Sequence, residues 1–332
     1  MTPLPPHLPP AIASAGVRLP LLADGALWIA APPSVAPLVT RWLPDLPPSP
    51  DPSADPGDAA CIRVRPAAEP RPSPPAGRPT LKLFGVACHV DDAASRATLS
   101  TAGGGAWGTV DLAGCRAELR VGDADAPDVE PEVYTMATVA AALLLGRLDR
   151  ALVHAAAVVG PDGRAWLLAG DTHAGKTTTT ANLLNAGWRY VSDDHVVVSR
   201  GGDGRLMVEG WPRRFHLDEG WADGRPVGRR GETDPRRLWP GMWLRSAPLA
   251  GLLFPRVSAV EPTLPEPIAP ADALARLLRQ TPWLLADRAR TPRLLALARS
   301  VAEMPAYSLR LGLDTYRSPA ALVAALAGVT GG

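Results

Sequence analysis

The chain has 332 residues, enough for one large domain or for two smaller domains that each bury a core. Its 34 lysines and arginines nearly balance its 33 aspartates and glutamates, which argues against nucleic acid or a membrane surface as a partner. Its three cysteines, Cys61, Cys88 and Cys115, include no Cys-x-x-Cys pair, which argues against a zinc site or a disulfide framework.

Two further sequence patterns bear on the cellular compartment of the protein. The first ten residues carry no basic segment of the kind that begins a secretory signal. The longest apolar stretch, residues 136–145, is too short to span a bilayer. We therefore expect a soluble cytoplasmic protein with no membrane partner.

The N-terminal part of the sequence predicts short strands separated by proline-rich loops. Prolines at this density cannot continue a helix or a sheet ladder, so residues 1–10, 44–57 and 66–79 are predicted as loops. A short helix is predicted over 34–42, and strands over 17–22, 26–30, 61–64, 80–90, 107–112 and 116–121. We expect residues 1–130 to form a small α+β domain that contains a small antiparallel sheet.

From residue 131 the pattern becomes that of a mixed α/β domain, in which apolar strands alternate with helical segments. Strands are predicted over 151–159, 165–169, 189–192, 196–199 and 306–311, and helices over 132–148, 176–185, 271–278, 291–304 and 318–327. Gly187 is predicted to end the helix before it in a left-handed conformation. We expect the chemistry of the protein to lie in this domain, residues 131–332.

One predicted loop of this domain has the sequence motif of a phosphate-binding loop. Residues Gly170 to Thr177 read Gly-Asp-Thr-His-Ala-Gly-Lys-Thr, which matches G-x-x-x-x-G-K-[ST] between a predicted strand and a predicted helix. From the composition, a chance match has a probability of about two in a thousand. The glycines let backbone N–H groups point at phosphate oxygens, and Lys176, one of only two lysines, adds charge for the β- and γ-phosphates. The predicted nucleotide-binding residues are Gly170, Asp171, Thr172, His173, Ala174, Gly175, Lys176, Thr177 and Thr178.

Paired carboxylates follow the next predicted strand. Asp193 and Asp194 come after residues 189–192, with one helix between them and the loop. We expect this strand to lie beside the strand that feeds the loop, so that both carboxylates reach the carboxyl edge of the sheet. There one carboxylate can hold Mg²⁺ together with the Thr177 hydroxyl, and the other can accept the proton of an attacking hydroxyl. The alternative is that the pair only begins a turn.

Three segments together resemble the kinase domain of the HPr kinase/phosphorylase family. They are His154-Ala-Ala-Ala-Val-Val, the stretch from Trp166 through the loop to Thr177, and Ala186-Gly-Trp-Arg-Tyr-Val-Ser-Asp-Asp. The resemblance covers residues 150–200 and is weaker towards the C-terminus. It implies a fold like that of HPr kinase and phosphoenolpyruvate carboxykinase. It also implies a general base at Asp193, a metal-binding or base-supporting role for Asp194, and His154 near the transferred phosphate.

The chain also departs from that family. The glycine-rich segment that follows the aspartate pair in the family, with its acidic metal ligand, has no convincing counterpart, and Glu209 is the nearest acidic residue. This argues against HPr as the substrate and against the reverse phosphorylase reaction. The chain is more similar to diverged relatives that phosphorylate a serine hydroxyl of ribosomally made peptides.

An arginine-rich segment occupies residues 205–245, where glycine, proline and tryptophan interrupt any helix and predict a long surface excursion. Guanidinium groups suit phosphates and carboxylates. The candidates for substrate or phosphate binding are Arg213, Arg214, Arg236 and Arg237. The alternative is a solvated loop in an arginine-rich protein.

These patterns predict a kinase that uses Mg²⁺ and ATP or GTP to phosphorylate a hydroxyl, most simply a serine of a peptide or protein. A small-molecule hydroxyl acceptor is the alternative within enzymes. A non-catalytic, nucleotide-sensing regulatory module is the alternative outside them, although a pure binder has no need of a base. A decarboxylating carboxykinase would need a second lysine near the loop. The acceptor and the formation of a homo-oligomer stay open.

Overall fold

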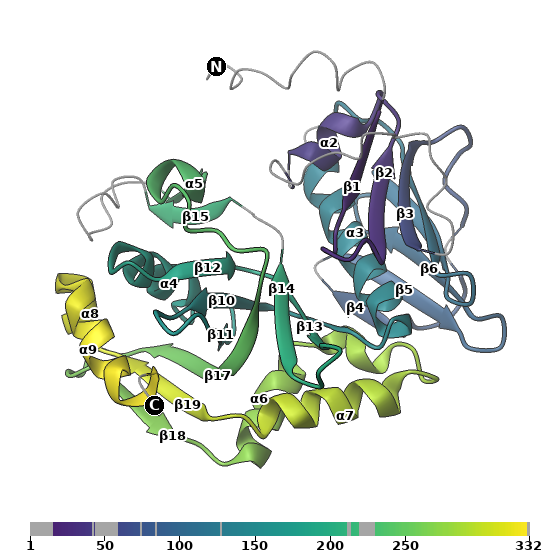
Figure 1. Ribbon diagram of the computed structural model, residues 1–332. Helices are drawn as coiled ribbons and strands as arrows, with labels where there is room; N and C mark the ends of the chain where they lie inside the picture. The colour runs from purple at the N-terminus through teal and green to yellow at the C-terminus, as the bar shows by residue number, and fades with distance from the viewer. Residues whose placement is uncertain are drawn as a thin grey trace. The chain divides into compact units, whose positions relative to one another are not determined.

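The computed structural model describes residues 16–41, 43, 59–73, 75–83, 85–126, 128–210, 214–218 and 230–330. The chain forms two compact units, one of Met1–Leu148 with Leu285–Ala289 and one of Asp149–Leu284 with Arg290–Gly332 (Figure 1). The division falls after Leu148 rather than after residue 130, because helix α3 (Val129–Arg147) packs on the N-terminal sheet. None of the helices in the described ranges is long and apolar enough to cross a membrane.

The N-terminal unit is built on an eight-stranded sheet with the order β1-β2-β3-β8-β7-β6-β5-β4. The strands are β1 (Val17–Pro20), β2 (Leu27–Ala31), β3 (Ala60–Pro66), β4 (Leu81–Leu83), β5 (Val86–Asp91), β6 (Arg96–Thr101), β7 (Ala106–Asp111) and β8 (Arg116–Val121), with helix α2 (Ala36–Thr40) after β2. The expectation of a small antiparallel sheet is wrong for two pairs, since β3 runs parallel to both β2 and β8. Long connections before and after β3 return the chain to the same end of the sheet, as parallel pairing requires.

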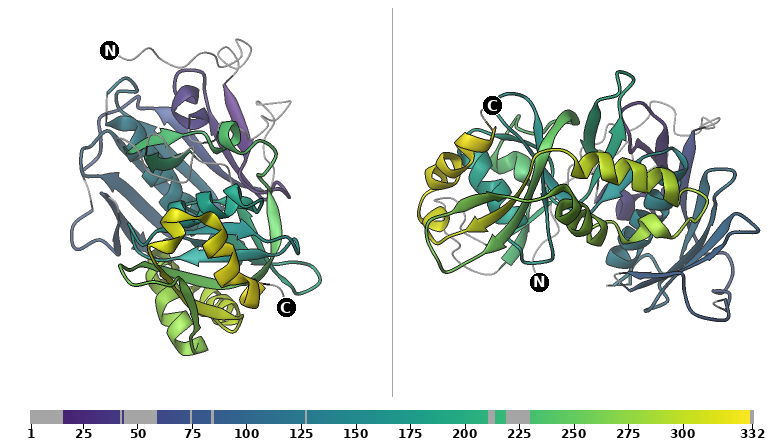
Figure 2. Two further views of the ribbon diagram at one scale, coloured as in Figure 1. Left: turned by 90° about the vertical axis from the view of Figure 1, so that its left-hand side faces the viewer. Right: turned by 90° about the horizontal axis from the view of Figure 1, so that it is seen from below.

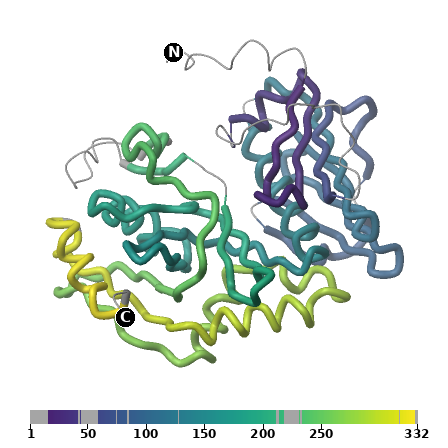
Figure 3. The backbone as a smooth tube through the Cα atoms, in the orientation of Figure 1, coloured from purple at the N-terminus to yellow at the C-terminus, as the bar shows by residue number. Residues whose placement is uncertain are grey.

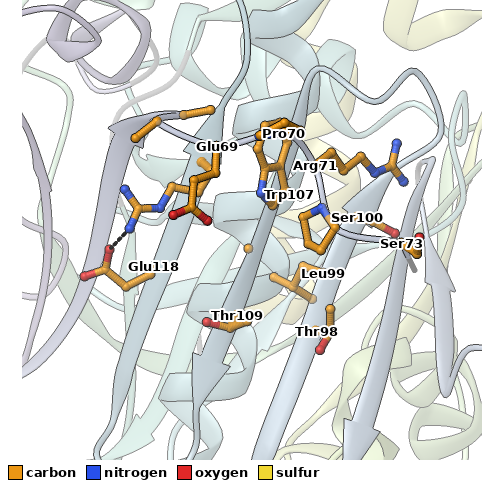
Figure 4. A pocket seen from close by; sticks show the side chains of 15 residues that line it. Glu69, Pro70, Arg71, Ser73, Thr98, Leu99, Ser100, Trp107, Thr109 and Glu118 are labelled. Carbon is orange, nitrogen blue, oxygen red and sulfur yellow. Dashed lines mark ion pairs between the residues drawn. The ribbon is translucent and has the colours of Figure 1, made fainter. Parts of the chain in front are cut away.

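The two faces of this sheet differ. One face packs against α3, whose apolar residues are buried around most of its circumference. Side chains alternate along each strand, so the other face carries partly exposed residues such as Thr98, Trp107 and Glu118. Residues 67–73 cross this second face and enclose a cavity of about 430 Å³ above it (Figure 4).

The second unit contains a nine-stranded arrangement in which the long strand β17 (Ser246–Val257) belongs to two branches. One branch has the order β12-β10-β11-β17, with β19 and β18 beyond it, and the other runs from β17 through β14 and β13 to β9. The other strands of this arrangement are β9 (Ala151–Val153), β10 (Ala155–Val159), β11 (Ala165–Ala169), β12 (Arg189–Ser192), β13 (Val196–Arg200), β14 (Leu206–Gly210), β18 (Leu264–Pro267) and β19 (Ala306–Leu311). Strands β15 (Phe215–Asp218) and β16 (Arg230–Thr233) form a separate two-stranded sheet. The helices are α4 (Lys176–Asn185), α5 (Pro235–Leu238), α6 (Pro270–Arg279), the 3₁₀ turn η2 (Pro282–Leu285), α7 (Thr291–Ala302), α8 (Asp314–Arg317) and α9 (Pro319–Thr330).

The strand predicted over 151–159 is broken at His154. Strand β9, before the break, pairs with β13, whereas β10, after it, pairs with β11 and β12. The backbone N–H of His154 donates to the Gln280 carbonyl at 2.9 Å, outside both ladders. The break therefore places a histidine where two branches of the sheet diverge.

The carboxyl ends of four strands meet at one edge of the sheet. Strands β11, β17 and β19 run parallel to one another, and β12 runs the same way because β10 lies antiparallel between β12 and β11. The predicted pairing of residues 189–192 with 165–169 is therefore wrong, since β10 separates them. The aspartates that follow β12 nevertheless lie at the predicted carboxyl edge. Because β10 is antiparallel to both β11 and β12, β12 runs in the same direction as β11.

Two cores flank the sheet, because alternate residues of β10, β11 and β17 point to opposite faces. On one face Leu168 packs with Leu183 of α4 and Leu326 of α9. On the other face Leu167 packs with Leu277 of α6 and residues of α7. Figure 2 shows α9 and the α6–α7 pair as separate layers of this unit.

Parts of the arginine-rich segment, residues 205–245, form regular secondary structure. Strand β14 lies within the sheet, β15 pairs antiparallel with β16, and α5 follows β16; the described parts of this segment are coloured green in Figure 3. Phe215, Leu217 and Trp239 are buried against Tyr190 and Leu184. The expectation of a surface loop is wrong for these stretches, because apolar residues between the arginines form a small core with α4.

Candidate functional site

The segment between β11 and α4 forms a tight loop at the carboxyl edge. His173 and Gly175 have positive φ values of 66° and 100°, and the Ala174 N–H donates to the Asp171 carbonyl at 3.1 Å. A Cβ on Gly175 would lie 2.7 Å from Leu311 Cδ1, so both the backbone angle and the neighbouring side chain require glycine there. Helix α4 begins at Lys176, and its first N–H groups are therefore presented at this loop.

Lys176 is folded onto the loop that precedes it. Its Nζ donates to the carbonyls of Gly170 at 2.6 Å and Asp171 at 3.1 Å, and the residue is only 8% exposed. Burial lowers the pKa of the Lys176 ammonium, and the charges of Asp194, Asp193 and Asp171 partly oppose this shift. The Lys176 ammonium group thus lies at the loop, hydrogen-bonded to two of its backbone carbonyl oxygens.

Asp193 lies directly after β12 and reaches across to α4. The Thr177 hydroxyl donates to Asp193 Oδ2 at 3.2 Å, and Asp193 is 5% exposed. Two oxygen donors from different segments thus meet beside the loop. Hydroxyl and carboxylate oxygens are ligands that Mg²⁺ accepts, with water and substrate phosphates completing its shell. The donor set of Thr177 and Asp193 therefore fits Mg²⁺. Among the described residues no group of three or more His, Cys, Asp or Glu side chains is arranged to hold a metal ion by itself.

Asp194 has a different setting from Asp193. His154 Nε2 lies 3.3 Å from Asp194 Oδ1, and His195 Nδ1 lies 2.7 Å from Asp194 Oδ2. The two imidazole rings lie 5.4 Å apart, and the His195 ring lies 5.9 Å from Trp283. Trp283 is itself fixed, because its indole N–H donates to the Leu152 carbonyl at 2.7 Å. Asp194 is thus held from both sides and is less buried than Asp193.

Two residues of this cluster were not predicted from the sequence. His195 directly follows the aspartate pair, so the triplet Asp-Asp-His was the signal that could have found it. Gln280, at the end of α6, donates from Nε2 to Asp171 Oδ1 at 3.0 Å and accepts from the His154 N–H through its carbonyl. It is 5% exposed and joins the loop to the break between β9 and β10.

Of the four predicted arginines, Arg214, Arg236 and Arg237 lie in or directly beside β15 and α5. Arg213 lies outside the described residues, and Arg214 directly precedes β15. Arg236 binds Asp234 through Nε at 3.2 Å and Nη2 at 3.1 Å, and burial and Arg237 lower its pKa. Oε1 of Glu209, the acidic residue considered as a metal ligand, instead lies 3.5 Å from Nε of Arg245, which directly precedes β17. Arg236 and Glu209 therefore each have an oppositely charged side chain beside them.

Comparisons with known proteins define no family. No family model matches the sequence, and no curated protein matches it. Among solved structures, the HPr(Ser) kinase/phosphatase from Coxiella burnetii is similar with a TM-score of 0.32 and 10% sequence identity. The match covers 53% of this chain and 94% of that chain. A likeness of this size carries no functional conclusion.

Proposed function

We propose that this protein is a kinase that transfers the γ-phosphoryl group of Mg²⁺-bound ATP or GTP to a hydroxyl, specifically to a serine of a peptide or protein. The observation that supports this is the meeting of three groups at one edge of the sheet. The loop of Gly170–Thr177, the Thr177–Asp193 contact and the Asp194–histidine cluster all lie there. Phosphate binding, metal binding and proton transfer each have a candidate group.

The nucleotide phosphates are bound by the loop and the start of α4. Backbone N–H groups and the positive end of the helix dipole favour anions at this position. Lys176 leaves the Gly170 and Asp171 carbonyls and binds the β- and γ-phosphate oxygens. Entry of these anions also compensates for the burial that lowers the lysine pKa.

The two aspartates have separate roles. Thr177 and Asp193 hold Mg²⁺, which when bound neutralises charge on the phosphates. Asp194 accepts the proton of the acceptor hydroxyl as that oxygen forms its bond to the γ-phosphorus. The bond from the same phosphorus to the bridging oxygen breaks, and the nucleoside diphosphate leaves. This assignment exchanges the two aspartate roles that the family resemblance implies, because Asp193 and not Asp194 contacts Thr177.

The histidines and Gln280 position these groups. His154 and His195 flank Asp194 and fix its carboxylate plane, and Gln280 fixes Asp171 at the start of the loop. The two histidines act through Asp194 and Gln280 acts through Asp171, so all three are positioning residues.

The test uses full-length protein, Mg²⁺, γ-labelled ATP or GTP, and a degenerate peptide pool with serine, threonine or tyrosine at the fixed centre. We expect label on serine peptides with wild type and at least about a hundredfold less with Lys176→Ala or Asp194→Asn. Nucleotide binding without transfer by wild type, combined with no effect of Asp194→Asn on any property, would instead favour a nucleotide-sensing module. Transfer to a free hydroxy compound but to no peptide would favour the small-molecule alternative.

A further inference from the structure

A cavity of the second unit adjoins the phosphate loop. It has a volume of about 690 Å³ and lies between residues 170–174 of the loop, the carboxyl end of β17, strand β18 and helix α6. The site described above leaves this space unassigned. Its walls combine two chemistries, one cationic and one apolar.

The cationic part consists of three arginines from two elements. Arg256 lies at the end of β17, and Arg276 and Arg279 lie one turn apart on α6. Nowhere in the described ranges does any of the three form an ion pair or a hydrogen bond to a carboxylate. The charged or titratable groups that share the cavity with them are Asp171, Glu266 and His173. Of these, Asp171 already accepts from Gln280.

One of these arginines is positioned. The guanidinium carbon of Arg276 lies 5.5 Å from the centroid of the Phe254 ring, within the range of a cation–π contact. A guanidinium held in this way keeps its N–H groups for a ligand and loses less conformational entropy when the ligand binds. Arg236, which was predicted from the sequence as a candidate for substrate or phosphate binding, is instead paired with Asp234.

Apolar residues line the same space beside the arginines. Phe254, Val257 and Ile268 line it, and Val257 is 46% exposed although it is a large apolar side chain. An apolar wall beside unpaired guanidinium groups suits a ligand that carries both carboxylates and an apolar side chain.

The cavity and the phosphate loop share residues. Residues 170–174 line the cavity and also form the loop, while Gln280 contacts both Asp171 and the backbone of His154. A ligand in the cavity therefore lies beside the loop, one residue from the Asp194 cluster through Gln280.

We propose that this cavity binds an acidic segment of the peptide acceptor. Carboxylates of that segment pair with Arg276, Arg279 and Arg256, and an apolar side chain packs on Phe254 and Ile268. This inference rests on the proposed kinase function, because it names the class of acceptor for that site.

The test measures peptide binding separately from phosphate transfer. The probes are two fluorescein-labelled peptides of identical length, Gly-Ser-Glu-Glu-Leu-Glu-Gly and its counterpart with glutamine at every glutamate position. Their affinities for full-length protein are measured by anisotropy with a non-hydrolysable Mg²⁺–ATP analogue present. The variants are Arg276→Gln with Arg279→Gln, and Arg279→Glu alone, which alters an exposed side chain and leaves the core intact. Arg299→Gln on α7 is the matched control, since Arg299 pairs with Glu303 at 3.3 Å on an exposed surface.

We expect wild type and Arg299→Gln to prefer the glutamate peptide by about tenfold, and both cavity variants to lose that preference. Nucleotide affinity should stay within about twofold of wild type in all of them. Equal binding of the two peptides by wild type would overturn the inference, as would a preference that survives in both variants. A loss of nucleotide affinity in the cavity variants equal to the loss of peptide affinity would make the cavity a nucleotide subsite and would also overturn it. Failure of the kinase proposal is separate, since it appears as absence of transfer by wild type or as transfer that persists in Lys176→Ala.

Discussion

Replacing Gly175 with alanine tests whether the loop needs a glycine for the reasons given. Gly175 has φ of 100°, and an added Cβ would lie 2.7 Å from Leu311 Cδ1 and 3.4 Å from Val257 Cγ2. The positive φ costs an alanine about 1–2 kcal/mol. The close contact with the buried Leu311 costs about another 1–3 kcal/mol, because a packed side chain must shift. We expect Gly175→Ala to lower the free energy of unfolding by about 2–5 kcal/mol.

A matched glycine separates the two contributions. Gly163 has φ of 77°, yet a Cβ there would meet no atom within 4 Å. Gly163→Ala should therefore lose only about 1–2 kcal/mol, from the backbone term. Urea unfolding followed by far-UV circular dichroism measures both variants, and nucleotide affinity is measured under folded conditions. Only Gly175→Ala should weaken nucleotide binding. Equal losses of stability in the two variants, or unchanged nucleotide affinity in Gly175→Ala, would refute the steric argument for the loop.

Three further expectations concern the proposed roles and one buried thiol. Asp194→Asn should reduce phosphate transfer by about 10²–10⁴-fold while nucleotide affinity changes little, because only proton acceptance is lost; single-turnover transfer and equilibrium binding measure the two. Asp193→Asn should raise the Mg²⁺ concentration needed for half-maximal activity by about tenfold or more, and a titration curve identical to wild type would argue against Asp193 as a ligand. Burial raises the pKa of Cys88 to about 12 from 9.0, so the unfolded thiol ionises above pH 9 while the folded thiol keeps its proton. Stability should then fall as pH rises from 9 towards 12, and Cys88→Val should reduce that slope in urea unfolding across this range; an unchanged slope would contradict the assignment.

Much of the local structure near the site could be predicted from the sequence. Apolar runs on both sides of the glycine loop predicted β11 and α4, and Gly187 has the left-handed φ of 88° that was expected at the end of α4. These predictions succeed because they depend on neighbouring residues alone. Apolar periodicity and the φ requirement of a helix end are both local properties.

The order of strands could not be predicted in the same way. That β10 lies between β12 and β11, and that β9 and β10 belong to different branches, depends on pairings between distant segments. An apolar run such as residues 151–159 reads as one strand because periodicity does not show a change of partner. Helix α3 was predicted within two or three residues but was assigned to the other domain, since its burial does not reveal which sheet it covers.

The sequence motifs singled out the loop and the aspartate pair, but they missed His195, directly after that pair, and Gln280, which is distant in the chain. Gln280 is 109 residues from Asp171, its hydrogen-bond partner, and nothing in its neighbourhood sets it apart. The density of arginines drew attention to Arg236, although a carboxylate two residues away binds it. The arginines around the cavity are spread over two elements, so only the folded structure brings them together.

The most direct test of the central claim is the transfer of labelled γ-phosphate from Mg²⁺–ATP to serine peptides by wild type, Lys176→Ala and Asp194→Asn in parallel. Nucleotide binding by all three proteins is measured in the same preparations. We predict labelled serine with wild type, loss of binding and transfer with Lys176→Ala, and binding without transfer with Asp194→Asn. Wild type and Asp194→Asn that bind the nucleotide equally and label peptides to the same extent would contradict the account.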